Sequence, residues 1–383
     1  MPATAAGESP EDSVRVVADS QQRPSARPEG GSVSRRISFS LKKIDRRQTV
    51  RELARVLHQR TQSWACHRLL TTRPKDDSTR MRAIPLPPRW PATHLFTVDV
   101  EDYFQVNAFE GIVDRAAWDR YPSRIERNVD LILELLQEHQ VHGTFFTLGW
   151  IAERYPALVR RIAELGHEVA SHGYWHRKVT TLSPEAFRED VRDAKARVED
   201  ATGQLCLGFR APSFSIRPGM EWAFEILAEE AYRYDSSIFP ISRPDYGYPH
   251  APPFPVMLHT ASGELLELPL ATTRMVGLRV PAAGGGYLRQ LPFSLTREAF
   301  SQWGELGVSA VLYTHPWELD PGQPRLPVGL VTRIRHYRNL GRTLPRLHAL
   351  MEKFKFTSVL NRYGDLIRPA ASPVLSAPTQ PAA

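Results

Sequence analysis

Short apolar runs alternate with amphipathic segments between residues 91 and 366. Runs rich in β-branched and aromatic residues and bounded by turn residues are typical of buried strands. We expect strands at 94–100, 143–148, 167–171, 207–210, 265–270 and 310–314. Apolar positions at helical spacing predict helices near 125–136, 152–165, 184–198, 219–232 and 296–306. Alternation of this kind predicts an α/β fold with a parallel sheet or barrel.

Local signals define several ends of these helices. Ser123 to Glu126 fits a capping box, in which the two side chains bond each other's backbone N–H groups. Ser183 followed by Pro184 is a strong helix start, and Gly166 is a plausible residue just beyond a helix C-terminus. These signals make us expect separate helices that pack against the strands.

The two ends of the chain have a different composition. Residues 1–40 are rich in Ser, Pro, Arg, Glu and Gly without periodicity, which predicts disorder, and 48–70 could form one amphipathic helix. Prolines between 83 and 90 oppose a continuing helix. We therefore expect a largely disordered N-terminal extension (1–90), one catalytic domain (91–366) and a disordered tail (367–383).

Charge and cysteine content narrow the classes of protein. The net charge of +7 comes from residues 1–90, where 18 Lys and Arg face 9 Asp and Glu; residues 91–383 have 31 against 33. A basic extension could make a peripheral contact with an anionic surface, but it does not predict a nucleic-acid-binding domain. Two distant cysteines support neither a disulfide framework nor a thiolate metal site. No apolar run is long enough for a membrane span.

Reactive residues follow four of the predicted strands. The first strand runs into Asp99, Glu101 and Asp102, and the third runs into His172 and His176. Arg210 and His315 follow two later strands. In parallel α/β folds, functional side chains gather at the carboxyl ends of the strands. Two imidazoles and a carboxylate could bind a divalent metal there and leave positions open for water and substrate.

Several motifs together resemble a known family, the NodB-homology polysaccharide deacetylases of carbohydrate esterase family 4. The likeness is closest to the branch associated with exopolysaccharide gene clusters and PEP-CTERM/exosortase systems. The motifs are TVDVEDYF (97–104), GTFF (143–146), SHGYWH (171–176), FRAPSF (209–214), YDSS (234–237), GGGY (284–287), YTHPW (313–317), QPR (323–325) and RHYRN (335–339).

This resemblance implies a distorted, incomplete (β/α) barrel that hydrolyses linear amide bonds, removing N-acetyl groups from an amino-sugar polysaccharide. It implies a divalent metal, Zn²⁺ with Co²⁺ or Ni²⁺ as alternatives. By the same resemblance, Asp99 is the general base, Arg210 orients it, and His315 is the general acid. His172, His176 and Asp102 are the expected metal ligands, with Glu101 as the alternative to Asp102. The expected substrate-binding residues are Tyr103, whose backbone N–H is a candidate oxyanion donor, Phe214, Tyr287 and Trp317.

Two other functions fit the same sequence. One is an amide or imide hydrolase of the same fold that acts on a small cyclic substrate, and exposed aromatic residues around the site would argue against it. The other is an inactive carbohydrate-binding or assembly protein, and the joint presence of Asp99, His172, His176 and His315 argues against it. The N-terminus lacks a secretory signal, which favours the cytoplasm, with the cell envelope as the alternative.

Overall fold

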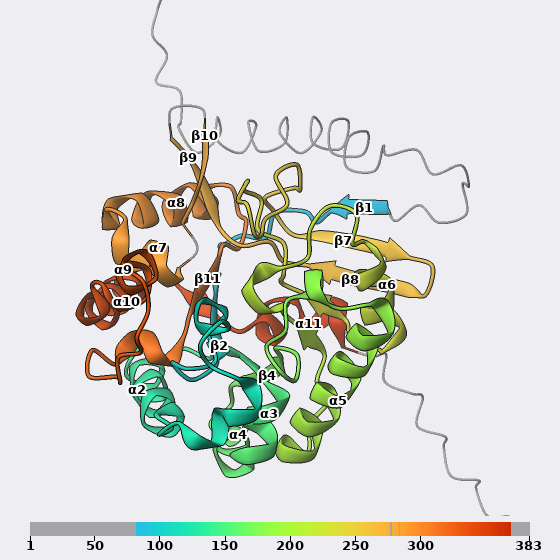
Figure 1. Cartoon of the computed structure of the whole chain (residues 1–383). Coiled ribbons are helices and arrows are strands. Elements are labelled where there is room, and N and C mark those ends of the chain that lie inside the picture. Colours follow the sequence, from blue (N-terminus) through green and yellow to red (C-terminus); the bar gives the residue numbers. More distant parts are fainter. Residues whose placement is uncertain (1–81, 276–277, 283, 369–383) are drawn as a thin grey trace, which may run out of the picture. The chain divides into compact units, whose positions relative to one another are not determined.

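A computed structural model of the chain describes residues 82–275, 278–282 and 284–368 (Figure 1). The disorder expected for 1–40, the helix expected at 48–70 and nearly all of the expected tail lie outside the described residues. The description below concerns the described part of the catalytic domain.

Most of the strands belong to one large sheet. The strands are β1 (Arg82–Pro85), β2 (His94–Val100), β3 (Thr144–Thr147), β4 (Glu168–Ser171), β5 (Gly208–Phe209), β6 (Tyr234–Asp235), β7 (Val256–Thr260), β8 (Gly263–Glu267), β9 (Thr272–Met275), β10 (Leu278–Pro281), β11 (Val311–Thr314) and β12 (Phe356–Thr357). The sheet order is β1-β7-β8-β6-β5-β4-β3-β2-β11, and β12 pairs with β2. The run from β8 through β6, β5, β4, β3 and β2 to β11 is parallel, whereas β7 is antiparallel to both of its neighbours.

The helices connect these strands and lie around them (Figure 1). They are α2 (Ile125–Glu138), α3 (Gly149–Arg154), α4 (Pro156–Glu164), α5 (Pro184–Thr202), α6 (Trp222–Glu229), α7 (Gly285–Gln290), α8 (Phe293–Glu305), α9 (Leu330–Tyr337), α10 (Thr343–Lys353) and α11 (Val359–Ile367). In Figure 1, α2, α4 and α5 form an outer layer along the lower side of the molecule.

The barrel is incomplete, as expected. Between β8 and β11 the described residues make only single bridges, Leu270 with Val311 and Gly284 with Tyr313, and no continuous ladder. At Gly284, φ is +141° and a Cβ atom would lie 1.8 Å from the carbonyl O of Tyr313, so only glycine fits this close approach. The sheet therefore forms an open barrel, in which β8 and β11 are not joined by a continuous ladder.

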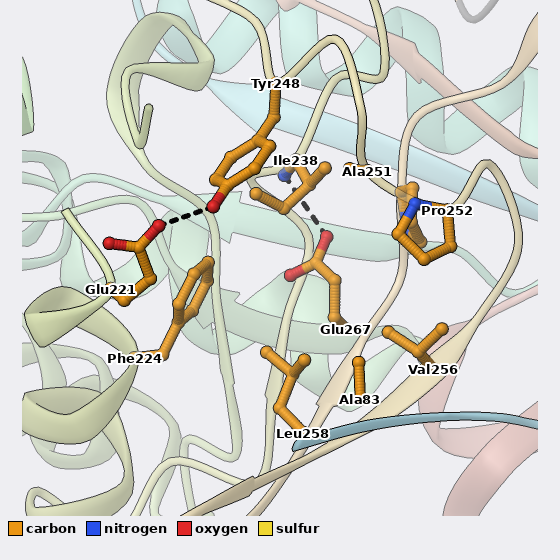
Figure 2. Close-up of a pocket in the computed structure, with 11 residues that line it drawn as sticks. Ala83, Glu221, Phe224, Ile238, Tyr248, Ala251, Pro252, Val256, Leu258 and Glu267 are labelled. Atoms are coloured by element: carbon orange, nitrogen blue, oxygen red, sulfur yellow. Dashed lines mark hydrogen bonds between the residues drawn. The ribbon is translucent and has the colours of Figure 1, made fainter. Parts of the chain in front are cut away.

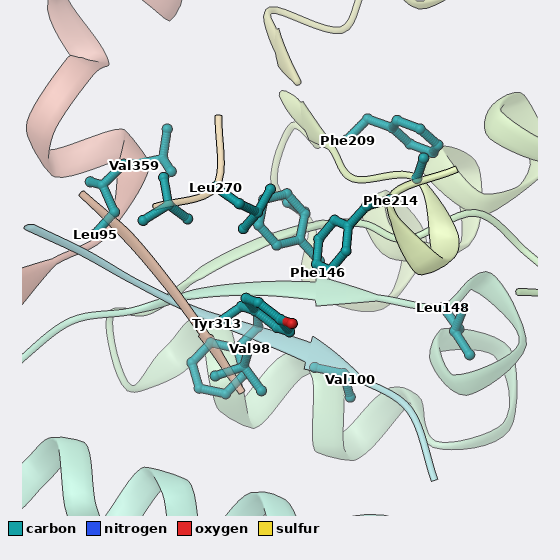
Figure 3. Close-up of a cluster of buried hydrophobic side chains, with 14 of the residues drawn as sticks. Leu95, Val98, Val100, Phe146, Leu148, Phe209, Phe214, Leu270, Tyr313 and Val359 are labelled. Carbon is teal, nitrogen blue, oxygen red and sulfur yellow. The ribbon is translucent and has the colours of Figure 1, made fainter. Parts of the chain in front are cut away.

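Burial in the core explains why the sequences of the central strands are continuous apolar runs. All seven residues of β2 are buried, as expected for a parallel strand covered on both faces. Figure 3 shows Val98 and Val100 of β2 in one cluster with Phe146 of β3 and Tyr313 of β11. This apolar interior fixes the directions of the strands and with them the positions of the residues at their ends.

Sequence signals predicted some helix ends correctly and others wrongly. The Ser183 side chain accepts a hydrogen bond from the N–H of Ala186, so the predicted cap of α5 is confirmed. The capping box at Ser123 is wrong, because α2 begins at Ile125 without a side-chain cap. Pro156 divides the helix expected at 152–165 into α3 and α4.

The folded region begins earlier than expected. β1 lies inside the expected N-terminal extension and pairs with β7 as the last strand of the sheet. An edge position suits Pro85, which cannot donate a hydrogen bond to a second neighbour. Within the part of the chain that the structure describes, no helix has the length and apolar character to cross a membrane.

Candidate active site

The parallel strands bring the predicted reactive residues to one end of the sheet. Register pairs Asp99 with Phe146 on β3, and Ser171 on β4 with Phe209 on β5. His172 and Arg210 follow these last two positions directly. On the other side of β2, Thr314 is paired with Val98, which puts His315 beside Asp99. Residues from four separate segments of the chain therefore meet at neighbouring strand ends.

Arg210 holds Asp99 in place. The guanidinium group is fully buried, and its Nη1 donates to Asp99 Oδ1 at 2.6 Å and to Thr97 Oγ1 at 2.8 Å. Its Nε and Nη2 donate to the backbone O and the Oγ of Ser236. All three guanidinium nitrogens thus donate hydrogen bonds, which a buried cation needs to offset the loss of water. Asp99 Oδ1 is thereby fixed, while Oδ2 faces His315 Nε2 at 3.8 Å.

Glu101, His172 and His176 form a buried group that could hold a metal ion. One possible ligand atom from each lies within 4.8 Å of the others. His176 Nε2 is 2.8 Å from Glu101 Oε2. His172 Nδ1 lies 2.8 Å from the carbonyl O of Arg210, so Nδ1 carries the proton and donates it, which leaves the Nε2 lone pair for a cation.

The chain turns sharply to present these two histidines. Gly173 has φ +72°, and a Cβ atom there would lie 2.7 Å from Asp190 Oδ2. That same oxygen accepts the backbone N–H of Tyr174 at 2.8 Å. Asp190 of α5 therefore anchors the loop after β4, and the glycine is required for the approach.

The donor set fits a divalent cation. His176 Nδ1 is buried and has no hydrogen-bond partner among the described residues, which is costly for a polar atom unless something else binds there. Two imidazoles and one carboxylate are a common ligand set for zinc and related ions. A second group, Glu138, His139 and His348, is partly exposed on the surface and contains none of the predicted site residues.

Asp102 is not beside the histidines, contrary to the expectation that it would be the ligand carboxylate. Its Oδ2 accepts the hydroxyl of Ser123 at 2.8 Å and the N–H of Arg124 at 2.7 Å, and its Oδ1 accepts the N–H of Tyr103. Asp102 thus organises the start of α2, and Glu101 replaces it in the candidate ligand set. The Tyr103 N–H is used in this bond, so the structure does not leave it free as an oxyanion donor.

His315 belongs to a second charged group that the sequence did not reveal. Glu318 Oε2 accepts the backbone N–H of His315 and lies 3.0 Å from its Nδ1, and Glu318 Oε1 accepts from Arg289 Nε at 2.6 Å. Arg289, also fully buried, donates to backbone carbonyls of Arg335 and Arg338. The His-Pro-Trp-Glu spacing, which matches a capping box, was the available signal for Glu318.

These neighbours shift the pKa values in opposite directions. Burial, with a smaller contribution from His176, outweighs Asp99 and Glu101 and lowers the pKa of His172 to about 4, so its ring is neutral near pH 7. Burial also lowers the pKa of His315, but Glu318, Glu101 and Asp99 together outweigh it and raise the pKa to about 9. Burial raises the pKa of the Glu101 carboxyl, but the His176, His315 and His172 rings hold it at about 2. The site therefore pairs a neutral imidazole with a protonated one.

The predicted aromatic residues are less accessible than expected. Trp317 is 6% exposed; it stacks on His315 and donates its Nε1–H to Glu101 Oε1 at 3.2 Å. Tyr103 and Phe214 are also buried. Tyr287 is half-buried, with its hydroxyl beside Tyr246 and Arg243. Trp317 thus orients the charged groups, and Tyr287 is the residue of this set that a sugar could reach.

An apolar cavity lies apart from this site. It has a volume of about 50 Å³ and is lined by residues such as Phe224, Ile238, Val256 and Leu258. Figure 2 shows Glu221 bonded to Tyr248 at one side and Glu267 bonded to the N–H of Ile238. None of the predicted site residues lines it.

Asp235 lies next to Glu267 in the paired strands β6 and β8. It accepts the N–H and hydroxyl of Ser237, so it caps the turn, one of the roles that its sequence context suggests. Burial raises the pKa of both carboxyls. The pair supports the Ser236 turn that Arg210 contacts, and it does not reach the metal group.

Comparison with known proteins finds similarity to polysaccharide deacetylases. Residues 116–224 match the model of the polysaccharide deacetylase family, and residues 236–363 match a domain of unknown function, DUF3473. A chitooligosaccharide deacetylase of Rhizobium leguminosarum bv. trifolii is 37% identical over 76 residues, 20% of this chain and 35% of that protein. A peptidoglycan-N-acetylglucosamine deacetylase of Bacillus cereus is 32% identical over 95 residues, 24% of this chain and 34% of that protein.

The chain spans about a third of the length of these curated relatives. A solved structure from Mycobacterium smegmatis, described as a candidate polysaccharide deacetylase, superposes with a TM-score of 0.50 at 21% identity, covering 75% of this chain and 95% of that one. That likeness confirms the fold. Together, the family model and the relatives show that part of this chain is similar to polysaccharide deacetylases.

Proposed function

We propose that the protein is a metal-dependent deacetylase that removes N-acetyl groups from an amino-sugar polysaccharide. One observation carries the proposal: a buried Glu101, His172 and His176 group lies beside Asp99, which Arg210 holds, and His315. This arrangement provides a cation site, a base and an acid, with His315 Nε2 at 3.4 Å from Glu101 and 3.8 Å from Asp99.

Glu101, His172 and His176 would hold the cation. When bound, a zinc-like ion would polarise the acetyl carbonyl and lower the pKa of water toward about 7. Asp99 Oδ2 accepts the proton of the attacking water, because Arg210 occupies Oδ1 and orients the carboxylate.

His315 supplies the second proton transfer. Its Nε2 faces the carboxylates of Asp99 and Glu101, at 3.8 and 3.4 Å, and is therefore aimed at the same space as the base. Glu318 holds Nδ1 and keeps the ring protonated, so Nε2–H can be donated to the departing amine. The products are acetate and a free amino sugar, which gains positive charge.

The polymer is proposed to be an exopolysaccharide. This finer statement is supported by the likeness of residues 97–104, 284–287 and 335–339 to the exopolysaccharide-associated branch. The accessible aromatic rings of Tyr287 and Trp175 suit a sugar face better than a small cyclic amide. We propose the cytoplasm or the cell envelope as its place of action.

Acetate release tests the proposal. The full-length protein is stripped with a chelator, refilled separately with Zn²⁺, Co²⁺, Ni²⁺ or Mn²⁺, and assayed on a panel of N-acetylated oligosaccharides. We expect metal-dependent release that falls by about 10²- to 10⁴-fold in Asp99→Asn and His315→Ala. His250→Ala, at an exposed histidine, is the matched control.

Two outcomes would contradict the proposal. Full activity in the stripped protein would exclude a metallohydrolase. Metal binding without release from any oligosaccharide, but with turnover of a cyclic amide, would favour the alternative hydrolase of the same fold.

A further inference from the structure

Helix α9 exposes an unusual concentration of apolar side chains. Leu330, Val331 and Ile334 are 70%, 64% and 41% exposed. At about 100° per residue, these positions occupy one sector of the helix, with Leu330 and Ile334 one turn apart. The described residues contain eight large exposed apolar side chains, so three on an eight-residue helix form a patch.

Arginines surround this patch without acidic partners. Residues 321–351 contain six arginines and no Asp or Glu. Arg333 and Arg335 lie on α9, and Arg338 follows it directly; all three are exposed. Within the described ranges, these three side chains make no ion pair. The patch is therefore apolar at its centre and cationic at its margins.

Buried residues at the C-terminal end of α9 attach the helix to the domain. His336 and Tyr337 are buried, and the His336 ring stacks on Trp317 with centroids 4.1 Å apart. Arg289 donates to backbone carbonyls at the C-terminal end of the helix. α9 cannot roll its apolar side chains inward without breaking these contacts, and none of the described residues covers them.

The combination of side chains identifies the kind of partner. A second copy of this patch would bring six arginines against six, and like charges oppose that contact. An anionic polymer would be bound by the arginines alone and would leave three aliphatic side chains in water. An anionic phospholipid surface satisfies both features, since acyl chains accept the aliphatic groups and phosphates accept the guanidinium groups.

We propose that α9 and its flanking arginines dock the protein on an anionic phospholipid surface, with Leu330, Val331 and Ile334 inserted among the headgroups. Arg289 links this helix to Glu318, which holds His315. Docking would therefore present the acid side of the catalytic group close to the membrane. The proposal concerns the surface alone and does not depend on the deacetylase activity.

Vesicle binding by the full-length protein tests the proposal. Vesicles of phosphatidylcholine alone are compared with an equimolar mixture of phosphatidylcholine and phosphatidylglycerol in co-sedimentation. We expect the triple variant Leu330→Ser, Val331→Ser, Ile334→Ser to bind the anionic vesicles about tenfold or more weakly than the wild type. Arg333→Gln and Arg335→Gln should each weaken binding by about fivefold.

Controls separate α9 from the basic residues 1–90, which every variant retains. Leu205→Ser, at an apolar side chain that is 65% exposed in a different loop, should bind like the wild type. An added tryptophan reports insertion directly: Leu330→Trp should show emission that shifts to the blue and is quenched by brominated lipid. Leu205→Trp should show neither change. Thermal unfolding confirms that each variant is folded.

Three results would overturn the proposal. The first is wild-type protein that does not bind anionic vesicles, or a triple variant that binds as well as the wild type. The second is weaker binding in the arginine variants alone, which would indicate recognition of negative charge without lipid insertion. The third is a lipid-free dimer that the triple variant abolishes, since self-association would then explain the patch.

Discussion

Strands β2 and β4 each carry a buried histidine at the amino end and reactive residues at the carboxyl end. At the amino ends, His94 Nδ1 accepts the N–H of Ala310 and His167 Nδ1 accepts the N–H of Gly143. Burial lowers the pKa of both rings to about 4, so they stay neutral. At the carboxyl end of β11, next to β2, the His315 side chain is 16% exposed and its pKa is about 9.

Burial therefore does not decide what these histidines do; the carboxylates beside them do. His94 is surrounded by the rings of Phe300, Phe354 and Phe356, which offer no negative charge. His315 faces Asp99, Glu101 and Glu318. A buried imidazole is a packed, neutral residue in the first setting and a proton donor in the second.

The largest expected effect at the reactive end is that of His172→Ala. It removes one ligand from the candidate cation group, so metal affinity should fall by more than the roughly 10- to 100-fold typical of losing a residue that only orients a ligand. Metal content and dissociation constant are measured in a His348→Ala background, which eliminates the surface group of Glu138, His139 and His348. Unchanged metal affinity in the double variant, compared with His348→Ala alone, would show that the buried group is not the cation site.

Glu318→Gln should have a smaller effect and should act through protonation. Without the Glu318 charge, the pKa of His315 falls from about 9, so the alkaline limb of kcat/KM moves to lower pH. We expect about a 100-fold loss at alkaline pH and a smaller loss near neutrality, with metal affinity retained. Glu221→Gln, at a carboxylate beside the separate apolar cavity, is the control for the charge change. An equal loss at every pH would mean that Glu318 serves packing alone.

The smallest expected effect on activity is that of His94→Gln at the amino end. Burial holds the folded pKa of His94 at about 4, below its ordinary value of 6.5, so its contribution to stability is complete above pH 6.5 and is lost as pH falls toward 4. Gln can still accept the Ala310 N–H but does not titrate. The variant should keep its kcat at neutral pH. As pH falls from 6.5 to 4, its unfolding free energy should decrease by up to about 3 kcal/mol less than that of the wild type.

Urea unfolding across that pH window measures the effect. An exposed-site control, His250→Gln, should leave the slope of stability against pH unchanged. A slope for His94→Gln equal to that of the wild type would show that His94 is already protonated in the folded protein, and the contrast between the two ends would fail.

The positions of the reactive strands could be predicted from sequence because their apolar runs are short and sharply bounded. β2 was expected at 94–100 and lies there. Choosing between Glu101 and Asp102 was not possible in this way. The choice depends on Ser123 and Arg124, which capture the Asp102 carboxylate from a segment 21 residues further along the chain.

The groups around His315 were harder still to predict. Arg289, Glu318 and the carbonyls of α9 meet only through tertiary contacts across 29 to 49 residues. α7 begins with glycines, and the apolar sector of α9 is short and faces outward. Periodicity therefore gave no indication of either helix.

The pairing of β2 with β11 has a consequence for how the protein is made. Thr97 donates to the carbonyl O of Leu312, 215 residues later in the chain. At ribosomal speeds of about 5–20 residues per second, roughly 10–40 s pass between synthesis of these two strands. During that interval the nascent chain carries Asp99, and soon His172, but no His315. Each new molecule therefore lacks the proposed acid, and β2 lacks one of its neighbours, until β11 and His315 have been synthesised.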